Sequence, residues 1–213
     1  PAGVWCPIRA RGSCSADAQL VLCPHSEAPL QERHSVAQTL KRNPYRQGTQ
    51  WACAAAGAAN WRYEGGPLSG TYPLPALNGP HQIQNAATAL AVLEKLDGFT
   101  LTKGHVATGL QSVEWPARMQ HLNKGNLVRR VPTSVDIWLD GGHNAAAGEQ
   151  IAACFSGWEK TDDRPTYLIS GMLSTKDQLS YFRHMQTFVQ KAVMVPIPGE
   201  AASTPADTLA RVG

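Results

Sequence analysis

The feature that most constrains the fold is a regular alternation of strand-like and helix-like segments between residues 135 and 197. Three short apolar segments are typical of buried strands, and the two segments between them have the apolar spacing of helices. The predicted strands cover 135–140, 166–173 and 192–197, and the predicted helices cover 145–158 and 176–190. Strands that alternate with helices in this order pair in parallel, because each helix returns the chain to the same end of the sheet. The sequence therefore predicts an α/β fold with a Rossmann-like parallel sheet and flanking helices.

The chain upstream of residue 120 has a different character. The predicted elements are a strand at 61–64, an extended edge segment at 71–75, a helix at 83–96, and a short helix from about Ala107 to just before Trp115–Pro116. Prolines account for the edge segment and for the end of the second helix. Residues 1–45 show little periodicity. The change of character near residues 114–120 predicts a domain boundary there.

Composition and charge exclude several classes of protein. The net charge is +3, and the Lys and Arg residues are scattered rather than gathered into a nucleic-acid footprint. No apolar stretch approaches the roughly 18 residues that a membrane span needs. The five cysteines form no C-x-x-C pair, and no targeting pattern precedes them. We therefore expect a cytoplasmic protein that binds neither nucleic acid nor membrane, and the start at Pro1 suggests a piece of a longer chain.

Three motifs with chemically distinctive residues occur in order along the chain. They are L-N-G-P-H-Q-I-Q-N-A-A at 77–87, W-P-A-R-M at 115–119 and L-D-G-G-H-N at 139–144. A fourth, G-M-L-S-T-K-D, lies at 171–177. Together they resemble the motifs of the folylpolyglutamate synthase/dihydrofolate synthase family, a branch of the Mur ligase superfamily. The resemblance covers residues 47–213.

This resemblance implies a division into domains. Residues 1–114 would form the C-terminal part of a central ATP-binding domain, and residues 115–213 a truncated C-terminal glutamate ligase domain of the Mur ligase type. The family's G-x-x-x-x-G-K-[ST] phosphate loop does not occur in the chain. Its Mg²⁺ ligands are expected upstream of Pro1, and its carbamylated lysine corresponds to Pro1 itself. The resemblance therefore implies that the chain by itself is inactive.

The resemblance also implies an activity. Members of the family use ATP and Mg²⁺ to phosphorylate a folate or dihydropteroate carboxylate, and the amine of L-glutamate then attacks the acyl phosphate. Cationic groups must neutralise the charge that develops on the phosphate. We therefore expect a monomeric, ATP-dependent, amide-forming ligase of folate biosynthesis or polyglutamylation, with folate or dihydropteroate and L-glutamate as its small-molecule partners.

Four residues match family positions that contact the nucleotide. The resemblance places Asn85 at the adenine edge and Arg118 at the phosphates. It places Asp140 at the ribose and His143 near the phosphates. Each residue also has a plainer interpretation. Asn85 can bond backbone at a helix start, Arg118 can be an exposed boundary residue, Asp140 can form an Asx turn, and His143 can be a polar surface residue. No residue with metal-ligand spacing accompanies His143, so no metal site is predicted.

His143 and Lys176 are the candidate catalytic residues. Lys176 follows a predicted strand and could approach the substrate, or it could, with Asp177, merely start a helix. Two other functions stay open. One is a non-catalytic fragment or degraded gene product with at most weak nucleotide binding. The other is an unrelated α/β hydrolase or transferase that uses His143 with Asp140, although no G-x-S-x-G motif supports it.

Overall fold

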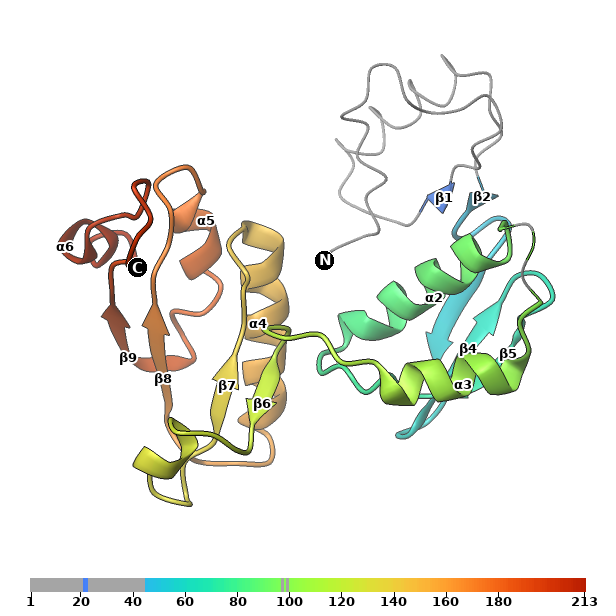
Figure 1. Cartoon of the computed structure of the whole chain (residues 1–213), viewed down its shortest axis with the longest axis horizontal. Helices are drawn as coiled ribbons and strands as arrows, with labels where there is room; N and C mark the ends of the chain where they lie inside the picture. Colours follow the sequence, from blue (N-terminus) through green and yellow to red (C-terminus); the bar gives the residue numbers. More distant parts are fainter. Residues whose placement is uncertain (1–20, 23–44, 97, 99) are drawn as a thin grey trace, which may run out of the picture. The chain divides into compact units, whose positions relative to one another are not determined.

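The computed structural model describes residues 21–22, 45–96, 98 and 100–213, and these residues form two compact units (Figure 1). The N-terminal unit contains the described residues of Ala2–Ala76 and His81–Val113, and the C-terminal unit contains Leu77–Pro80 and Glu114–Gly213. The unpatterned segment 1–45 falls almost entirely outside the described residues. None of the helices in the described ranges combines the length and the apolar content that a membrane crossing requires. The assignment of 1–114 and 115–213 to two ligase domains stays a prediction.

A three-stranded antiparallel sheet forms the centre of the N-terminal unit. Its strands, in spatial order, are β3 (Ala52–Ala55), β4 (Asn60–Glu64) and β5 (Gly70–Pro73), and β1 (Val21–Leu22) and β2 (Tyr45–Arg46) form a separate parallel pair. β5 is an edge strand of the described sheet and tolerates its proline there, as predicted. Alternation along β4 turns Trp61 and Tyr63 into the core, where both are fully buried.

Two helices pack against this sheet. α2 (His81–Leu93) contacts β3, and α3 (Lys103–Ser112) contacts β5. The buried face of α2 carries the small residues Ala86, Ala87 and Ala91. These side chains belong to the same core as the aromatic residues of the sheet, so the helix can approach the large rings closely.

The start of α3 is set by a capping box. Thr102 Oγ1 accepts a hydrogen bond from His105 N at 3.2 Å, and His105 Nδ1 accepts one from Thr102 N at 3.4 Å. The helix therefore begins upstream of Ala107, where the apolar spacing had placed its start. It ends at Ser112, before Trp115, as the following proline predicted.

The carboxylate of Glu94 joins the residues after α2 to the sheet. Its Oε2 accepts hydrogen bonds from Tyr45 Oη at 3.2 Å, Tyr63 Oη at 2.9 Å and Gly66 N at 2.9 Å. Its Oε1 accepts a fourth from Leu68 N at 2.9 Å. Four donors therefore satisfy a half-buried carboxylate that no motif had indicated.

Three tyrosines near Glu94 make the stability of the N-terminal unit sensitive to alkaline pH. Burial, followed by the Glu94 carboxylate, raises the pKa of Tyr45, Tyr63 and Tyr72 above the ordinary value of a phenol. In the unfolded chain these phenols lose their protons near pH ~10, whereas the folded unit retains them. Their contribution to stability is therefore complete below about pH 10 and is lost as the pH rises toward the folded pKa values.

We expect the urea midpoint of the N-terminal unit to fall above pH ~10 because of these shifts. The variant Tyr63→Phe should have a shallower fall, since it removes one of the shifted phenols. Urea titrations followed by NMR of the methyl groups of each unit, whose signals do not exchange with solvent, measure the midpoint at each pH. Tyr167→Phe is the matched control, because Tyr167 is exposed in the C-terminal unit. An equal pH dependence in the parent chain and in Tyr63→Phe would contradict this account.

The C-terminal unit is an α/β structure with parallel strands, which confirms the predicted fold class (Figure 1). β8 (Thr166–Ser170) pairs in parallel with β9 (Val189–Met194), and β6 (Gln120–Leu122) pairs antiparallel with β7 (Ile137–Leu139). The helices are α4 (Ala145–Trp158), α5 (Gln178–Phe182), α6 (Ala206–Leu209) and the 3₁₀ helix η1 (Val128–Arg130). α4 occupies the range that its apolar spacing predicted.

A glycine sets the distance between α4 and α5. A Cβ atom on Gly148 would lie 2.2 Å from Tyr181 O and 3.0 Å from Tyr181 C, so no side chain fits between the two helices. Phe155, Phe182 and Met185 are buried in the core that surrounds this contact. The close approach therefore holds the apolar centre of the unit together.

The helix predicted at 176–190 is wrong in its extent. α5 ends at Phe182, and β9 begins at Val189 rather than at residue 192. The residues between them form turns, in which Met185 N donates to Phe182 O at 2.8 Å and Val189 N donates to Met185 O at 3.2 Å. Met185 is only 1% exposed. The prediction failed because apolar residues that are buried in a turn have the same spacing as the apolar face of a helix.

The strand predicted at 135–140 is shorter and differently paired than expected. Its hydrogen-bonded partner among the described strands is β6, a segment without a strand-like pattern that the sequence analysis missed. β8 also stops at Ser170, before the predicted limit of residue 173. Within the described residues, the parallel ladder thus joins two strands instead of the three expected.

Candidate functional site

Asp140 lies directly after β7, at the carboxyl end of that strand, and is bonded to two backbone segments. Its Oδ2 accepts a hydrogen bond from Met119 N at 2.8 Å, and its Oδ1 accepts one from Gly142 N at 2.6 Å. The second bond is the Asx turn that the plainer interpretation expected. The first bond connects the D-G-G-H-N segment to the W-P-A-R-M segment, so the two motifs meet at this carboxylate.

Three further hydrogen bonds hold the same segments together. Gly141 N donates to Ala117 O at 2.9 Å, and Ala117 N donates to Gln120 Oε1 at 3.0 Å. Asn78 Nδ2, from the first motif, donates to Met119 O at 3.1 Å. We call these residues, Asn78, 117–120 and 140–142, the loop junction. Asn78 and Gln120 were not among the predicted site residues. Their side chains bond the backbone, and the spacing of residues in a motif does not show which backbone group a side chain will bond.

Arg118 stands between two residues with left-handed backbone conformation. The φ angles are +57° at Ala117 and +41° at Met119, in a region that residues other than glycine seldom adopt. Arg118 itself is half-buried and makes no hydrogen bond or ion pair with any other described residue. Its guanidinium is therefore available for a ligand, as a planar donor set suited to phosphate oxygens.

His143 is exposed on the loop between β7 and α4. Its Nδ1 lies 3.0 Å from Gly141 O, a contact that favours the proton on Nδ1. Asn144 follows and caps α4 by accepting a hydrogen bond from Ala147 N at 2.9 Å. A Cβ on Gly142 would lie 2.8 Å from both Asp140 Oδ1 and Ala147 Cβ, so the tight loop requires glycine at this position.

Lys176 and Asp177 precede α5. Asp177 caps the helix by accepting a hydrogen bond from Ser180 N at 3.1 Å, and hydrogen bonding by Ser180 lowers the pKa of Asp177. The helix-start interpretation therefore holds for Asp177. Lys176 is half-buried and shares no hydrogen bond with the described residues of the loop junction. Its catalytic role stays a prediction.

Asn85 lies on α2, in the N-terminal unit. Its Nδ2 donates to Gln82 Oε1 at 3.0 Å, one turn earlier on the same helix. The side chain is half-buried, and its carbonyl oxygen is not engaged in that bond. The proposed adenine contact of Asn85 stays a prediction, as do the nucleotide contacts of Arg118, Asp140 and His143.

A separate charged network lies at the amino end of β7. Asp136 bonds Arg164 Nη2 at 2.6 Å and His121 Nε2 at 3.0 Å, and Arg164 also pairs with Asp162. Hydrogen bonds from Arg164, and then from His121, lower the pKa of Asp136. These side chains are well exposed, so the network resembles a solvated ion-pair cluster more than a ligand site.

The described residues do not by themselves suit a Mg²⁺ site. No group of three or more His, Cys, Asp or Glu side chains in the described ranges is arranged to hold a metal ion. Mg²⁺ prefers carboxylate oxygens and water, and both oxygens of Asp140 already accept backbone hydrogen bonds. The expectation that the Mg²⁺ ligands lie upstream of Pro1 stays a prediction.

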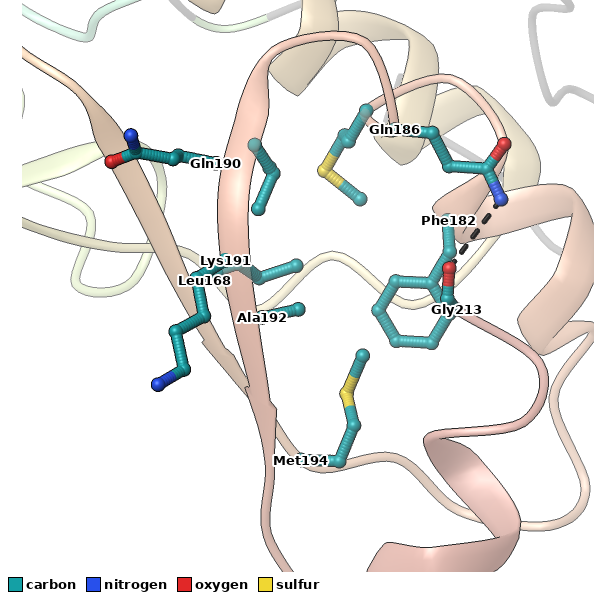
Figure 2. A pocket seen from close by; sticks show the side chains of 10 residues that line it. Leu168, Phe182, Gln186, Gln190, Lys191, Ala192, Met194 and Gly213 are labelled. Atoms are coloured by element: carbon teal, nitrogen blue, oxygen red, sulfur yellow. Dashed lines mark hydrogen bonds between the residues drawn. The ribbon is translucent and has the colours of Figure 1, made fainter.

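A cavity in the C-terminal unit does not coincide with the predicted site. It has a volume of about 380 Å³ and is lined mainly by apolar side chains of β8, β9 and α5 (Figure 2). Figure 2 shows Phe182 and Met194 turned toward it, and a hydrogen bond of 3.4 Å from Gln186 Nε2 to Gly213 O at its rim. None of Arg118, Asp140, His143 and Lys176 lines this cavity.

Comparison with known proteins gives matches over part of the chain. No family model matches it. The probable dihydrofolate synthetase of Schizosaccharomyces pombe is 30% identical over 108 residues, which make up 50% of this chain and 24% of that protein. E. coli FolC, solved in complex with DHPP and ADP, has a TM-score of 0.65 at 25% identity and is matched over 84% of this chain and 39% of FolC. A bifunctional folylpolyglutamate synthase/dihydrofolate synthase with Mn, AMPPNP and L-glutamate bound has a TM-score of 0.67 at 26% identity, over 86% of this chain and 40% of that one.

These matches define the class of the chain as an α/β protein with the Mur ligase fold. Within that class, the chain resembles the folylpolyglutamate synthase/dihydrofolate synthase proteins, and the resemblance predicted from the motifs is confirmed. The chain spans about a quarter of the length of the curated relative and about two fifths of the solved proteins.

Proposed function

We propose that this chain supplies part of the nucleotide site and the glutamate ligase domain of an enzyme that adds L-glutamate to a folate or dihydropteroate carboxylate. The observation that carries the proposal is the loop junction, in which Asn78, Met119 and Asp140 of three separate motifs are joined by hydrogen bonds. The ligands of the matched proteins, DHPP and ADP in one and AMPPNP and L-glutamate in another, support the same reaction.

The proposed reaction has two steps. A carboxylate oxygen of the folate attacks the γ-phosphorus of ATP and ADP leaves, which forms an acyl phosphate. The glutamate nitrogen then attacks the acyl carbon, phosphate leaves, and the nitrogen loses its proton to solvent. Negative charge builds up on the phosphoryl oxygens in the first step, so donors and cations must surround them. Bound Mg²⁺ would neutralise part of that charge.

The predicted residues take the following roles in this proposal. Arg118 binds phosphate oxygens with its planar guanidinium, and its lack of a described partner is consistent with that role. Asn85 reads the adenine edge through its amide, and Asp140 belongs to the same nucleotide site. His143 lies near the phosphates, and Lys176 approaches the acceptor substrate.

By themselves, the 213 residues are proposed to bind nucleotide weakly and to lack turnover. The sequence contains no G-x-x-x-x-G-K-[ST] motif. The backbone N–H groups of such a loop, together with the helix that follows it, provide much of the affinity for nucleotide phosphates. The residues that remain would contact the adenine and the phosphates alone.

An NMR titration of the chain with ADP and Mg²⁺ tests this function. We expect saturable shifts of the amides near Asn85, near Arg118 and in the 140–144 loop, with a Kd on the order of a millimolar, which is about 4 kcal/mol of binding free energy. Calorimetry should detect no micromolar ATP binding, and incubation with ATP, a folate and glutamate should release no ADP. Micromolar binding or turnover would contradict the proposed inactivity. Shifts confined to other residues, or no shifts at all, would contradict the nucleotide site.

A further inference from the structure

We propose that Asp140 is a positioning residue whose carboxylate holds the backbone of Met119, directly after Arg118, so that its effect on nucleotide affinity passes through the Arg118 guanidinium. The proposal rests on the function proposed above and names the residue that orients its phosphate-binding group. It separates two residues that motif matching alone had given the same kind of role, a direct contact with the nucleotide.

The first argument is the conformational cost of the Arg118 segment. Ala117 and Met119 are both left-handed, at φ +57° and +41°, and each such residue costs about 1–2 kcal/mol relative to a relaxed backbone. A loop with this cost keeps its shape only where surrounding bonds require it. The position of Arg118 therefore depends on whatever holds its two neighbours.

The second argument is the set of bonds that hold those neighbours. Met119 is bonded at N by Asp140 Oδ2 at 2.8 Å and at O by Asn78 Nδ2 at 3.1 Å. Ala117 is bonded at O by Gly141 N at 2.9 Å, next to Asp140 in the chain. The bond from Met119 N is the one of these in which an ionised group takes part, and such bonds are about twice as strong as neutral ones. Asp140 is therefore the main restraint on the left-handed segment.

The third argument is the contrast between the two side chains. Both oxygens of Asp140 already accept a backbone hydrogen bond, from Met119 N and from Gly142 N. Arg118, in comparison, makes no hydrogen bond or ion pair with any residue that the structure describes. The carboxylate therefore already has a structural role in the loop, whereas the Arg118 guanidinium has none among the described residues and keeps its donors for a ligand.

The substitution Asp140→Asn tests the restraint without changing the shape of the side chain. An amide presents one oxygen and one NH₂ group, so it can accept from Met119 N or from Gly142 N but not from both. We expect amide exchange at one of these two positions to accelerate about tenfold or more, equivalent to about 1.4 kcal/mol. Asp136→Asn is the matched control, because Asp136 flanks the other end of β7 and bonds side chains only. Unchanged exchange at both Met119 and Gly142 would overturn the proposal.

A double-mutant cycle with Arg118→Ala tests the route to the nucleotide. ADP affinity is measured by NMR for Asp140→Asn, Arg118→Ala and the double variant. We expect each single variant to weaken ADP binding severalfold, and the double variant to bind within about twofold of Arg118→Ala alone. If the two losses multiply instead, Asp140 contacts the nucleotide itself and the proposal is wrong. If Arg118→Ala leaves ADP affinity unchanged, the nucleotide role of Arg118 fails together with this route, whereas the exchange result still decides whether Asp140 holds the loop.

Discussion

Replacing Gly148 with alanine is expected to destabilise the C-terminal unit by about 3 kcal/mol, at the upper end of the usual cost of overpacking. The new Cβ would lie 2.2 Å from Tyr181 O, well inside any permitted contact. The obstacle is backbone rather than a flexible side chain, so α4 and α5 must move apart. Their separation would loosen the buried side chains of Phe155, Phe182 and Met185.

Urea denaturation followed by hydrogen exchange in α4 and α5 measures this effect. Gly157→Ala is the matched control, because it makes the same change on the same helix where a Cβ meets no atom within 4 Å. Gly157 is exposed, and alanine there should stabilise the helix by up to about 1 kcal/mol. Equal effects of the two substitutions, or a destabilised N-terminal unit in Gly148→Ala, would show that helix contact is not the cause.

Replacing Glu94 with alanine is expected to cost the N-terminal unit about 3 kcal/mol, because four hydrogen bonds to one carboxylate are lost together. Two of the donors are the backbone N–H groups of Gly66 and Leu68, which would be left without their acceptor. A hydrogen bond to a charged group contributes about 1.5–3 kcal/mol, and relaxation of the loop with entry of water limits the total. Glu94→Gln should lose less, since its amide oxygen can still accept.

Glu64→Ala is the matched control for Glu94→Ala. Glu64 belongs to the same unit and pairs with Arg62 at 2.8 Å, but both side chains are more than half exposed. Its loss should change the free energy of unfolding by less than about 1 kcal/mol. Chemical denaturation resolved by exchange in β4 distinguishes the two. A Glu94→Ala variant as stable as Glu64→Ala would show that the four bonds contribute little.

The sequence predicted the elements whose local pattern agrees with their final environment. α4 is an example, since its apolar spacing coincides with its buried face and Asn144 marks its start. β4 is another, because large and polar residues alternate as its two faces do. The resemblance of the three motifs was likewise visible in order and spacing. These features depend on neighbouring residues, which a sequence displays directly.

The errors arise where long-range contacts decide the structure. β6 has a three-residue sequence without alternation, and it becomes a strand only because β7 lies beside it. Met185 fits a helical pattern but is buried in a turn instead. In the candidate site, the motifs indicated Asp140 as a candidate but did not indicate its backbone partners, because every residue except proline has a backbone N–H and the sequence does not show which of them bonds a side chain. Glu94 was missed for the same reason, as its donors lie far from it along the chain.

The placement of Leu77–Pro80 has a practical consequence for dissecting the protein. This short stretch belongs to the C-terminal unit, although the chain on either side of it belongs to the N-terminal unit. A single cut therefore cannot separate the two. A recombinant piece beginning at Glu114 would omit Asn78 and so deprive Met119 O of the amide that bonds it. An excised C-terminal unit would need the tetrapeptide restored, as a graft or an added peptide, before its loops could be compared with those of the whole chain.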